Sequence, residues 1–572
     1  MSTISNRWTP RAFGRGGHRF FILEDSRLPH HASPEWDDSH HAIPATLSAA
    51  LELSATQFPD KEAIVEGKRR VTYGMLWRRS EAVAGALSAA GIGRGDHVGI
   101  CVGNGAEWAE IFYGIVRIGA VAVPVNTRLM PNEIAYQLRN ADVKLLFMAS
   151  ALLKIDFVEV LRSICPAIDH ALPSPEFPEL RTVVVLDDAA PTGCLIFDTF
   201  LAGRPESAPF LPDAEDVALI QYTSGTTSLP KGVLLTHRNI VTDAYFVGKR
   251  MGITPRDRYL SARPFFHVAG STLSAVLSCV HGATLVTMQR FVPEDALRLL
   301  SQEHCTLTAG NDTMYLMMLG SADFPKWKYN LRGGWAAVSG PILRRIADEM
   351  GAIETVTGYG LSEASPNIVT SDYRDPLEER ADGWMRPHPG LEIRIADPEN
   401  DAPLATGEKG EIQVRGWCVM KGYYRNEEAT AKVMTPDGFL RTGDLGILKD
   451  DGRMAFVGRL KEIIRVGGEN VAPSEIENVL HQHPRIRQAQ VFGLPDSRLI
   501  EVVGAYIVPK DGETLTEAEI VEWLKPQLAG FKIPKYVSII DTFDIVGMTA
   551  SAKVPKKLLV EHAIRQFGLA AV

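Results

Sequence analysis

The sequence has few cysteines, no long apolar run and no excess of positive charge, and each absence excludes a class of protein. Its six cysteines are scattered over 572 residues without a C-x-x-C pair, which argues against a disulfide framework or zinc site and favours a reduced compartment. No stretch approaches the roughly 18 uninterrupted apolar residues of a membrane-spanning helix. The formal charge of -9 and the pI near 6.0 argue against a nucleic-acid-binding protein, which would be net basic.

The first 42 residues also lack a periodic apolar face, so we expect an N-terminal extension over residues 1–42. Three arginines near its start precede no apolar segment, which predicts that it is not a secretory signal and favours a cytoplasmic location. A metal site and a solvated arm are both open for its histidines, and the lack of a folded scaffold favours the arm. These histidines are His30, His31, His40 and His41.

Beyond this extension, helical patterns alternate with short apolar runs. The segment "EAVAGALSAAGIGRGD" predicts a helix that ends at Gly91, and "HVGICVG" predicts the strand that follows. Such alternation is typical of an α/β fold, with a mostly parallel sheet covered by helices. From about residue 388, alternating strands broken by turn residues predict a small antiparallel β unit.

The chain is too long for one ordinary core, so at least two domains are expected. We predict a large N-terminal domain over residues 43–459, built of layered α/β sheets and carrying the antiparallel β unit. A helix in "PSEIENVLHQH", two apolar strands and a helix in "TEAEIVEWLKPQL" then predict a compact α+β C-terminal domain over residues 460–572.

One stretch, "YTSGTTSLPKGVLLTH" from Tyr222 to His237, combines hydroxyls, glycines and a lysine between apolar flanks. A Walker A loop is excluded, because Pro230 precedes the lysine and Gly232 follows it. A Ser/Thr-rich surface turn is the simplest alternative. The apolar flanks instead favour a loop at the carboxyl end of a buried strand, where α/β proteins bind ligands.

This stretch resembles the phosphate-binding signature of the adenylate-forming superfamily, [YF]-T-S-G-T-T-G-x-P-K-G, and departs from it at Ser228. Other motifs of the superfamily follow in order as "RPFFHVAG", "GYGLSEAS", "RTGDLG", "GRLKEIIRVGGEN" and "TASAK". The resemblance extends from about residue 45 to the end. Its "GGEN" segment, with no carrier domain following, is most similar to stand-alone acyl-CoA synthetases, the AMP-binding enzymes.

The resemblance implies a two-step reaction. A carboxylic acid attacks the α-phosphate of ATP, which gives an acyl-adenylate and pyrophosphate, and the thiol of coenzyme A then displaces AMP. It further implies Mg²⁺ as the metal. The expected partners are coenzyme A and the acid or its acyl-adenylate, with no nucleic acid, and a homodimer is compatible with the resemblance. The small C-terminal domain is expected to be mobile and to rotate about a hinge near Lys461 between the two steps.

The same resemblance assigns roles to individual residues. Lys231, Glu363, His267 and Lys553 would be the catalytic residues, and Glu363 with Thr226 would hold the metal. Tyr359 would stack on adenine, Asp444 would accept the ribose hydroxyls and Arg459 would reach phosphate or ribose oxygens. The remaining nucleotide, hinge and coenzyme A residues would be Thr223, Ser224, Gly225, Thr226, Thr227, Ser339, Gly340, Gly360, Ser362, Lys461, Gly467 and Gly468.

The acyl pocket is expected beside His267, which is either a gate or a packed histidine. Small residues in this region are expected to leave room for a bulky or long acid. The expected lining residues are Val268, Gly270, Ser271, Thr272, Ala336, Ala337, Val338 and Ser339, with Tyr359 at the end of the pocket.

Some positions depart from the superfamily pattern. Ser228 and Ala552 replace glycines in elements of the adenylation step, and Asp312 stands where proline is usual. Two alternatives therefore stay open at this point. The protein could form only the thioester from a preformed acyl-adenylate, or it could bind an acyl-nucleotide without catalysis; the survival of Lys553 disfavours the binder.

Overall fold

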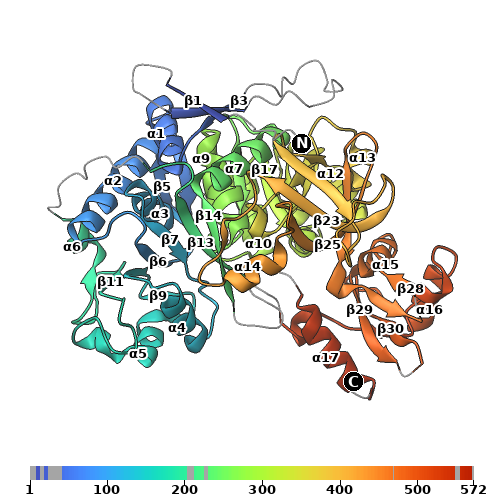
Figure 1. The fold of residues 1–572 in the computed structure, drawn as a ribbon. Coiled ribbons are helices and arrows are strands. Elements are labelled where there is room, and N and C mark those ends of the chain that lie inside the picture. The colour runs from blue at the N-terminus through green and yellow to red at the C-terminus, as the bar shows by residue number, and fades with distance from the viewer. Residues whose placement is uncertain are drawn as a thin grey trace.

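The computed structural model has a large N-terminal domain and a small C-terminal domain, which lies at the lower right of Figure 1. The two domains are built on separate sheets. The structure describes residues 8–12, 19–23, 41–202, 212–223, 230–467, 469–496, 498–547 and 554–569.

The first large sheet has eight strands and carries the predicted phosphate loop. Its pairs are parallel from β12 to β13, whereas β13–β14 and β14–β24 are antiparallel. In spatial order the strands are β12 (Leu195–Ile196), β11 (Thr182–Val185), β8 (Leu145–Met148), β6 (His97–Cys101), β7 (Val121–Pro124), β13 (Val217–Thr223), β14 (Lys231–Thr236) and β24 (Gly422–Tyr423).

The second large sheet has nine strands, and its six central strands from β19 to β4 are parallel. Both large sheets are therefore mostly parallel, as the alternating sequence pattern predicts. In spatial order the strands are β21 (Arg386–Pro387), β20 (Val369–Thr370), β19 (Glu354–Tyr359), β18 (Gly333–Ala337), β17 (Leu307–Asn311), β15 (Arg258–Ser261), β16 (Thr284–Thr287), β4 (Glu62–Glu66) and β5 (Arg69–Thr72).

Helices fill the space between the two large sheets and cover their outer faces. One buried cluster joins apolar residues of both sheets to the inner helices, and two further clusters join each outer face to its own helices. The inner helices are α1 (Leu47–Gln57), α2 (Tyr73–Ala89), α3 (Ala106–Arg117), α7 (His237–Met251), α8 (Val268–Gly270), the π-helix η2 (Ser271–Val276) and α9 (Leu277–Val280). The outer helices are α4 (Pro131–Asn140), α5 (Phe157–Ile164), α10 (Pro293–Gln302), α11 (Asp312–Leu319) and α12 (Gly340–Met350).

The expected antiparallel unit is a four-stranded sheet that follows the second large sheet. It ends at Arg459, directly before the expected hinge. Its strands are β22 (Leu391–Ala396), β23 (Lys409–Gly416), β25 (Leu440–Leu448) and β26 (Met454–Arg459). The N-terminal domain also has the short helices α6 (Phe197–Leu201), α13 (Leu377–Ala381), α14 (Glu427–Val433), η1 (Pro166–Asp169), η3 (Phe324–Lys326) and η4 (Ser362–Ala364).

The C-terminal domain has a separate sheet and two separate apolar clusters. Its long hairpin β29–β30 and the helix α15 occupy the segments in which the sequence predicts strands and a helix. The strands are β27 (Ile464–Val466), β28 (Glu469–Val471), β29 (Ile486–Asp496), β30 (Ile500–Pro509) and β31 (Tyr536–Ile539). The helices are η5 (Leu460–Glu462), α15 (Pro473–Leu480), α16 (Glu517–Leu524), η6 (Gly530–Lys532), η7 (Phe543–Ile545) and α17 (Lys556–Gln566).

The N-terminal extension differs from a purely solvated arm. Strands β1 (Trp8–Ala12) and β2 (Arg19–Leu23) pair antiparallel with each other and with β3 (His41–Pro44). A second small sheet joins β9 (Ala151–Leu152) to β10 (Ile155–Asp156). Among the expected histidines, His30, His31 and His40 lie outside the described residues, and the described part of the chain contains no cluster of three metal-ligating side chains.

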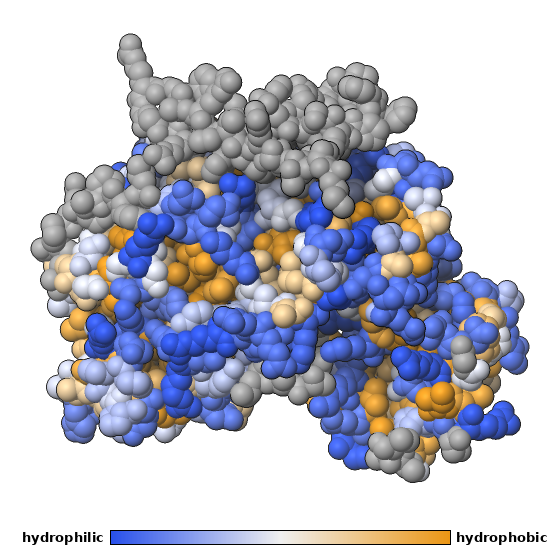
Figure 2. All heavy atoms as spheres, in the orientation of Figure 1, coloured by the Kyte–Doolittle hydropathy of each residue, from blue (hydrophilic) through white to orange (hydrophobic). Residues whose placement is uncertain are grey.

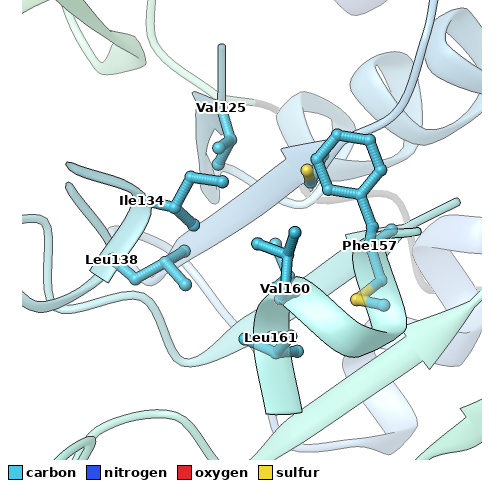
Figure 3. A pocket seen from close by; sticks show the side chains of 9 residues that line it. Val125, Ile134, Leu138, Phe157, Val160 and Leu161 are labelled. Carbon is cyan, nitrogen blue, oxygen red and sulfur yellow. The ribbon is translucent and has the colours of Figure 1, made fainter. Parts of the chain in front are cut away.

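The surface in Figure 2 is predominantly hydrophilic, with hydrophobic patches that are small and scattered. No helix among the described residues is long and apolar enough to span a membrane. A small apolar cavity lies between the first sheet and the helices α4 and α5 (Figure 3). Its lining residues include Val125, Ile134, Leu138 and Phe157 and none of the expected site residues, so we interpret it as a packing gap in the apolar core.

Candidate active site

The predicted phosphate loop connects two strands that pair as a hairpin. Thr223 ends β13 and lies opposite Lys231, which begins β14. Gly232 follows the lysine, and a side chain there would meet the Ile220 side chain at 2.7 Å and the Tyr222 ring at 3.3 Å. The glycine therefore lets the two strands pack closely beneath the loop. The expected residues Ser224, Gly225, Thr226 and Thr227, together with Ser228, lie outside the described residues.

Tyr423, at the end of β24, brings two expected catalytic residues together. Its hydroxyl donates a 2.8 Å hydrogen bond to Oε1 of Glu363, and Nζ of Lys231 lies 4.8 Å from its ring centroid. Burial and the neighbouring Glu363 carboxylate raise the pKa of Tyr423, so its hydroxyl keeps the proton that it donates. The lysine also gains a cation–π contact from the same ring. Sequence reasoning missed Tyr423, because the residue lies 60 positions from Glu363.

Glu363 belongs to the short helix η4, which follows β19 of the second sheet. Its main-chain oxygen accepts a hydrogen bond from the Met420 amide, so both its backbone and its side chain are anchored near β24. Gly360 lies just before η4, where a side chain would meet the carbonyl oxygen of Pro366 at 1.8 Å. Ser362, the first residue of η4, is half-buried. The turn is thus built by close backbone packing that only glycine permits.

Tyr359 and Asp444 also meet, as the sequence predicts for two residues around one nucleotide. The Tyr359 hydroxyl donates a 2.8 Å hydrogen bond to Oδ2 of Asp444, which is buried. Burial raises the pKa of Asp444, and Arg459, whose Nε is 3.6 Å from Oδ1, opposes this rise. Asp444 and Arg459 are register partners on β25 and β26. A buried carboxylate acceptor and an exposed guanidinium are therefore available side by side.

An aromatic pair extends this group. The Tyr359 ring stacks on Phe456 with a centroid distance of 5.0 Å and an interplanar angle of 19°. Phe456 is 41% exposed although it is large and apolar, so its ring presents a hydrophobic surface to solvent beside the site. Stacked aromatic rings of this kind can bind a planar heterocycle such as adenine. The sequence signal for Phe456 is its position on the strand that leads to Arg459.

Ser339 and Gly340 form the start of α12. The Ser339 amide donates a 2.9 Å hydrogen bond to Oδ1 of Asp312, and the Ser339 hydroxyl lies 3.5 Å from Nδ1 of His481 in the C-terminal domain. A side chain at Gly340 would meet the carbonyl oxygen of Ala381 at 2.2 Å. The expected adenine segment is therefore held by a carboxylate from α11 and is contacted from the second domain.

The acyl region combines an exposed histidine with a buried helical turn. His267 is exposed, and its Nδ1 accepts a hydrogen bond from the Ala269 amide at 3.1 Å, so it caps α8. The following Val268, Ser271 and Thr272 are buried. The next turn is a π-helix, a form that is frequent at functional sites. Gln221, on β13, donates to the carbonyl of Phe266 at 2.9 Å and ties this region to the hairpin.

Two expected pocket residues do not leave room for an acid, which corrects the sequence prediction. A side chain at Gly270 would meet the carbonyl of Pro264 at 2.0 Å, so this glycine serves backbone packing. Ala336 is fully buried in the cluster on the outer face of the second sheet, whereas its neighbour Trp335 packs in the cluster between the sheets. Successive strand residues point to opposite faces, so Trp335 and Ala337 face inward instead. Ala337 and Val338 are half-buried.

The expected hinge and coenzyme A residues lie in the first part of the C-terminal domain. Lys461 is exposed in η5, and Gly467 is exposed with a φ of +59°, a left-handed conformation that favours glycine. Gly468 and Lys553 lie outside the described residues. Near the C-terminal segment, Lys556 contacts Glu477 at 3.1 Å, so the helix that follows the expected catalytic lysine is tied to α15.

The geometry agrees with comparisons to known proteins. The profile of the AMP-binding enzyme family matches residues 51–424, and that of the AMP-binding enzyme C-terminal domain matches residues 475–553. Bacillus subtilis YngI, itself named as a candidate acyl-CoA synthetase, is 35% identical over 92% of this chain and 99% of its own. The medium-chain acyl-CoA ligase ACSF2, mitochondrial, of Danio rerio is 34% identical over 93% of this chain and 90% of its own.

Solved structures share the fold. ATP-bound MatB from Rhodopseudomonas palustris superposes with a TM-score of 0.77 at 27% identity, covering 91% of this chain and 98% of its own. o-Succinylbenzoate CoA synthetase from Bacillus subtilis, in complex with its acyl-adenylate intermediate, has a TM-score of 0.72 at 27% identity, with 89% and 97% covered. The fold of this chain is thus shared with enzymes whose structures were solved with ATP or with an acyl-adenylate.

Proposed function

The chain belongs to the AMP-binding enzyme family, and we propose that it works as a two-step acyl-CoA ligase through the residues described above. It is an acid–thiol ligase that converts a carboxylic acid and ATP to an acyl-adenylate and pyrophosphate, and then transfers the acyl group to coenzyme A. The observation that carries the assignment of residues is Tyr423, whose ring lies beside Lys231 and whose hydroxyl binds Glu363.

In the first step, positioning and charge neutralisation do most of the chemical work, because phosphoryl groups carry charge that must be balanced. Lys231 is proposed to neutralise the outer phosphates, with the hydroxyls of the loop after Thr223 as further donors. Tyr359 and Phe456 would hold the adenine ring, and Asp444 would accept the ribose hydroxyls. Lys553 is proposed to stabilise the charge that develops at the α-phosphate.

The residues present fit a magnesium ion. Glu363 offers carboxylate oxygens beside the phosphate loop, and Mg²⁺ typically combines one or two carboxylates with phosphate oxygens and water. Glu363 would hold the ion together with the Thr226 hydroxyl. When bound, Mg²⁺ would neutralise part of the phosphate charge. Tyr423 fixes the Glu363 carboxylate by its hydrogen bond, so the orientation of this ligand is set by the protein itself.

The second step is proposed to use another position of the C-terminal domain. A boundary near Lys461 is supported by the change of sheet, since the antiparallel unit ends at Arg459 and the next strand begins at Ile464. Rotation there would remove Lys553 and bring Gly467 and Gly468 to the site as part of a narrow channel for the pantetheine arm. A homodimer and a cytoplasmic location remain predictions, and the named ACSF2 relative is mitochondrial.

The two alternatives from the sequence are less well supported. Full-length relatives are named acyl-CoA ligases, which does not favour a protein limited to thioester formation or to binding. The test is pyrophosphate exchange into ATP with a panel of acids, followed by thioester formation from a synthetic acyl-adenylate and coenzyme A. Activity in both assays is expected. Thioester formation without exchange for any acid would refute the two-step proposal, and a Ser228→Gly, Ala552→Gly variant that restores exchange would identify the cause.

A further inference from the structure

Arg263 is a buried cation that the proposed reaction does not use. It lies two residues after the end of β15 and is only 6% exposed. Its Nε donates to the Ser261 hydroxyl at 3.2 Å, and its Nη2 donates to the Leu273 carbonyl at 2.8 Å. Nη2 also contacts the hydroxyls of Tyr259 and Ser274. All of these partners are neutral, and no Asp or Glu in the described ranges forms an ion pair with Arg263.

The second amino group of this guanidinium, Nη1, has no hydrogen-bond partner among the described residues. Nη1 is buried and makes no hydrogen bond within the described part of the chain. A buried cation without a counter-ion is unfavourable, and each buried donor left unpaired adds to the cost. Native proteins have few such groups, and a functional role or a bound group is among the reasons for keeping one. The free face of Arg263 therefore points to an acceptor that the described residues do not supply.

The surroundings of Arg263 lead toward the nucleotide site. Its Cζ lies 5.0 Å from the centroid of the Trp335 ring. A Cβ atom built on Gly358 would lie 2.6 Å from Nε1 of Trp335 and 2.6 Å from Oδ1 of Asn367. Gly358 immediately precedes Tyr359, which binds Asp444. A continuous line of residues thus runs from the ribose-binding carboxylate, past Gly358, to the guanidinium.

This line contains further polar atoms without partners. Nε1 of Trp335, Oδ1 of Asn367 and Oγ1 of Thr272 are all buried and make no hydrogen bond to the described residues. Thr272 is the second residue of the π-helix, and the next residue, Leu273, gives its carbonyl to Arg263. A hydrocarbon chain could not satisfy Nη1 of Arg263 or the unpaired atoms of Trp335 and Asn367 that follow it along this line. They indicate a ligand that carries polar atoms of its own.

We propose that Arg263 selects a carboxylic acid with an oxygen acceptor on its acyl portion, which accepts hydrogen bonds from Nη1 and completes the buried guanidinium. The inference rests on the proposed function, because it names the class of acid that the same site activates. The acceptor is a hydroxyl, a carbonyl or a second carboxylate. A plain alkyl acid would leave the donor unpaired, and sites built to hydrogen-bond a substrate discriminate strongly against analogues that lack the group.

The experiment uses the full-length protein and straight-chain acids of equal length that end in methyl, hydroxyl or carboxylate, taken through a series of lengths. For the best length, kcat/KM in pyrophosphate exchange is expected to be at least tenfold higher for an oxygen-ended acid than for its methyl-ended partner. Comparison of the hydroxyl and carboxylate arms shows whether the guanidinium needs an anion. Equal or better use of the methyl-ended acid at every length would overturn the proposal.

Variants separate selection from a structural role. Arg263→Met is expected to lower the ratio between oxygen-ended and methyl-ended acids at least tenfold. The matched control is Arg256→Met, the same change at an exposed position nearby, which should leave the ratio unaltered. An unchanged ratio in a folded Arg263→Met variant would refute the role. If that variant does not fold, Trp335→Phe is the second test, because it removes the indole N–H and keeps a smaller aromatic ring. It should lower the same ratio, and an unchanged ratio would refute the proposal.

Binding measurements keep this inference distinct from the proposed function. Non-hydrolysable acyl-sulfamoyl adenosines with the same three ends should bind with dissociation constants that differ at least tenfold in favour of the oxygen-ended forms. Such selectivity without any exchange activity would support the role of Arg263 and contradict the ligase proposal. Efficient exchange with methyl-ended acids, and equal binding of all three analogues, would support the ligase and overturn the selection.

Discussion

Tyr423 offers the sharpest test of how the site is organised, because one hydroxyl can be removed without removing the ring. In Tyr423→Phe, the 2.8 Å hydrogen bond to Glu363 is lost, while the aromatic face beside Lys231 remains. A hydrogen bond to a charged group contributes about 1.5–3 kcal/mol, which corresponds to roughly a 10- to 150-fold change in rate. We expect kcat/KM for ATP in pyrophosphate exchange to fall within that range.

The cause of this loss can be distinguished from general damage. If the tyrosine orients a metal-binding carboxylate, the variant should also need a higher Mg²⁺ concentration for half-maximal exchange. Thioester formation from a preformed acyl-adenylate should be affected much less, since the outer phosphates have already left. Tyr423→Leu removes the ring as well and should cost about 1 kcal/mol more, the typical value of a partly desolvated cation–π contact.

The neighbouring tyrosine supplies a matched control. Tyr424 donates its hydroxyl to Oδ2 of Asp142 at 2.6 Å, on the side of the first sheet away from Glu363. Tyr424→Phe makes the same chemical change one residue later and should leave exchange and its Mg²⁺ dependence within about twofold of the wild type. Equal effects of the two substitutions, or normal exchange in Tyr423→Phe, would refute the argument that this hydroxyl positions Glu363.

Three further predictions concern other parts of the molecule. Lys553→Ala should abolish exchange yet retain transfer from acyl-adenylate to coenzyme A, and equal loss of both would contradict a two-conformation cycle. Phe456→Ala should raise KM for ATP several-fold with little change in thermal stability, because an exposed ring is lost; an unaltered KM would contradict base stacking. Burial raises the pKa of Asp243 well above its usual value. The free energy of unfolding therefore falls as the pH rises from the usual pKa to the folded-state pKa, because in this range the unfolded chain ionises and the folded one does not. Asp243→Asn should therefore raise the melting temperature more at pH 8 than at pH 5, and a gain independent of pH would refute this.

The sequence predicts the parts of this fold that depend on local pattern. The strand at "HVGICVG" is β6, and the helix expected to end at Gly91 ends at Ala89, with Gly91 in a left-handed conformation. Mostly parallel sheets and the antiparallel unit are also confirmed. These features follow from apolar periodicity and turn residues within short windows. The C-terminal strands and helices are predicted for the same reason.

The site is only partly predictable, because its contacts join distant segments. Tyr359 and Asp444 were expected around one nucleotide, and they meet across 85 residues. Tyr423 and Phe456 were missed, since neither lies in a position that spacing alone marks as functional. The expectation of space at Ala336 was wrong, because composition does not say which face of a strand a small residue takes.

Asp312 shows that a departure from the family pattern can preserve the structure that the pattern encodes. It occupies the first position of α11, where proline is favoured because it has no N–H to leave unpaired. An aspartate suits the same position for another reason, since its charge interacts favourably with the N-terminal end of the helix dipole. Its carboxylate also accepts the Ser339 amide at 2.9 Å, a bond that proline could not form. The substitution therefore exchanges backbone rigidity for a direct contact with the expected adenine segment.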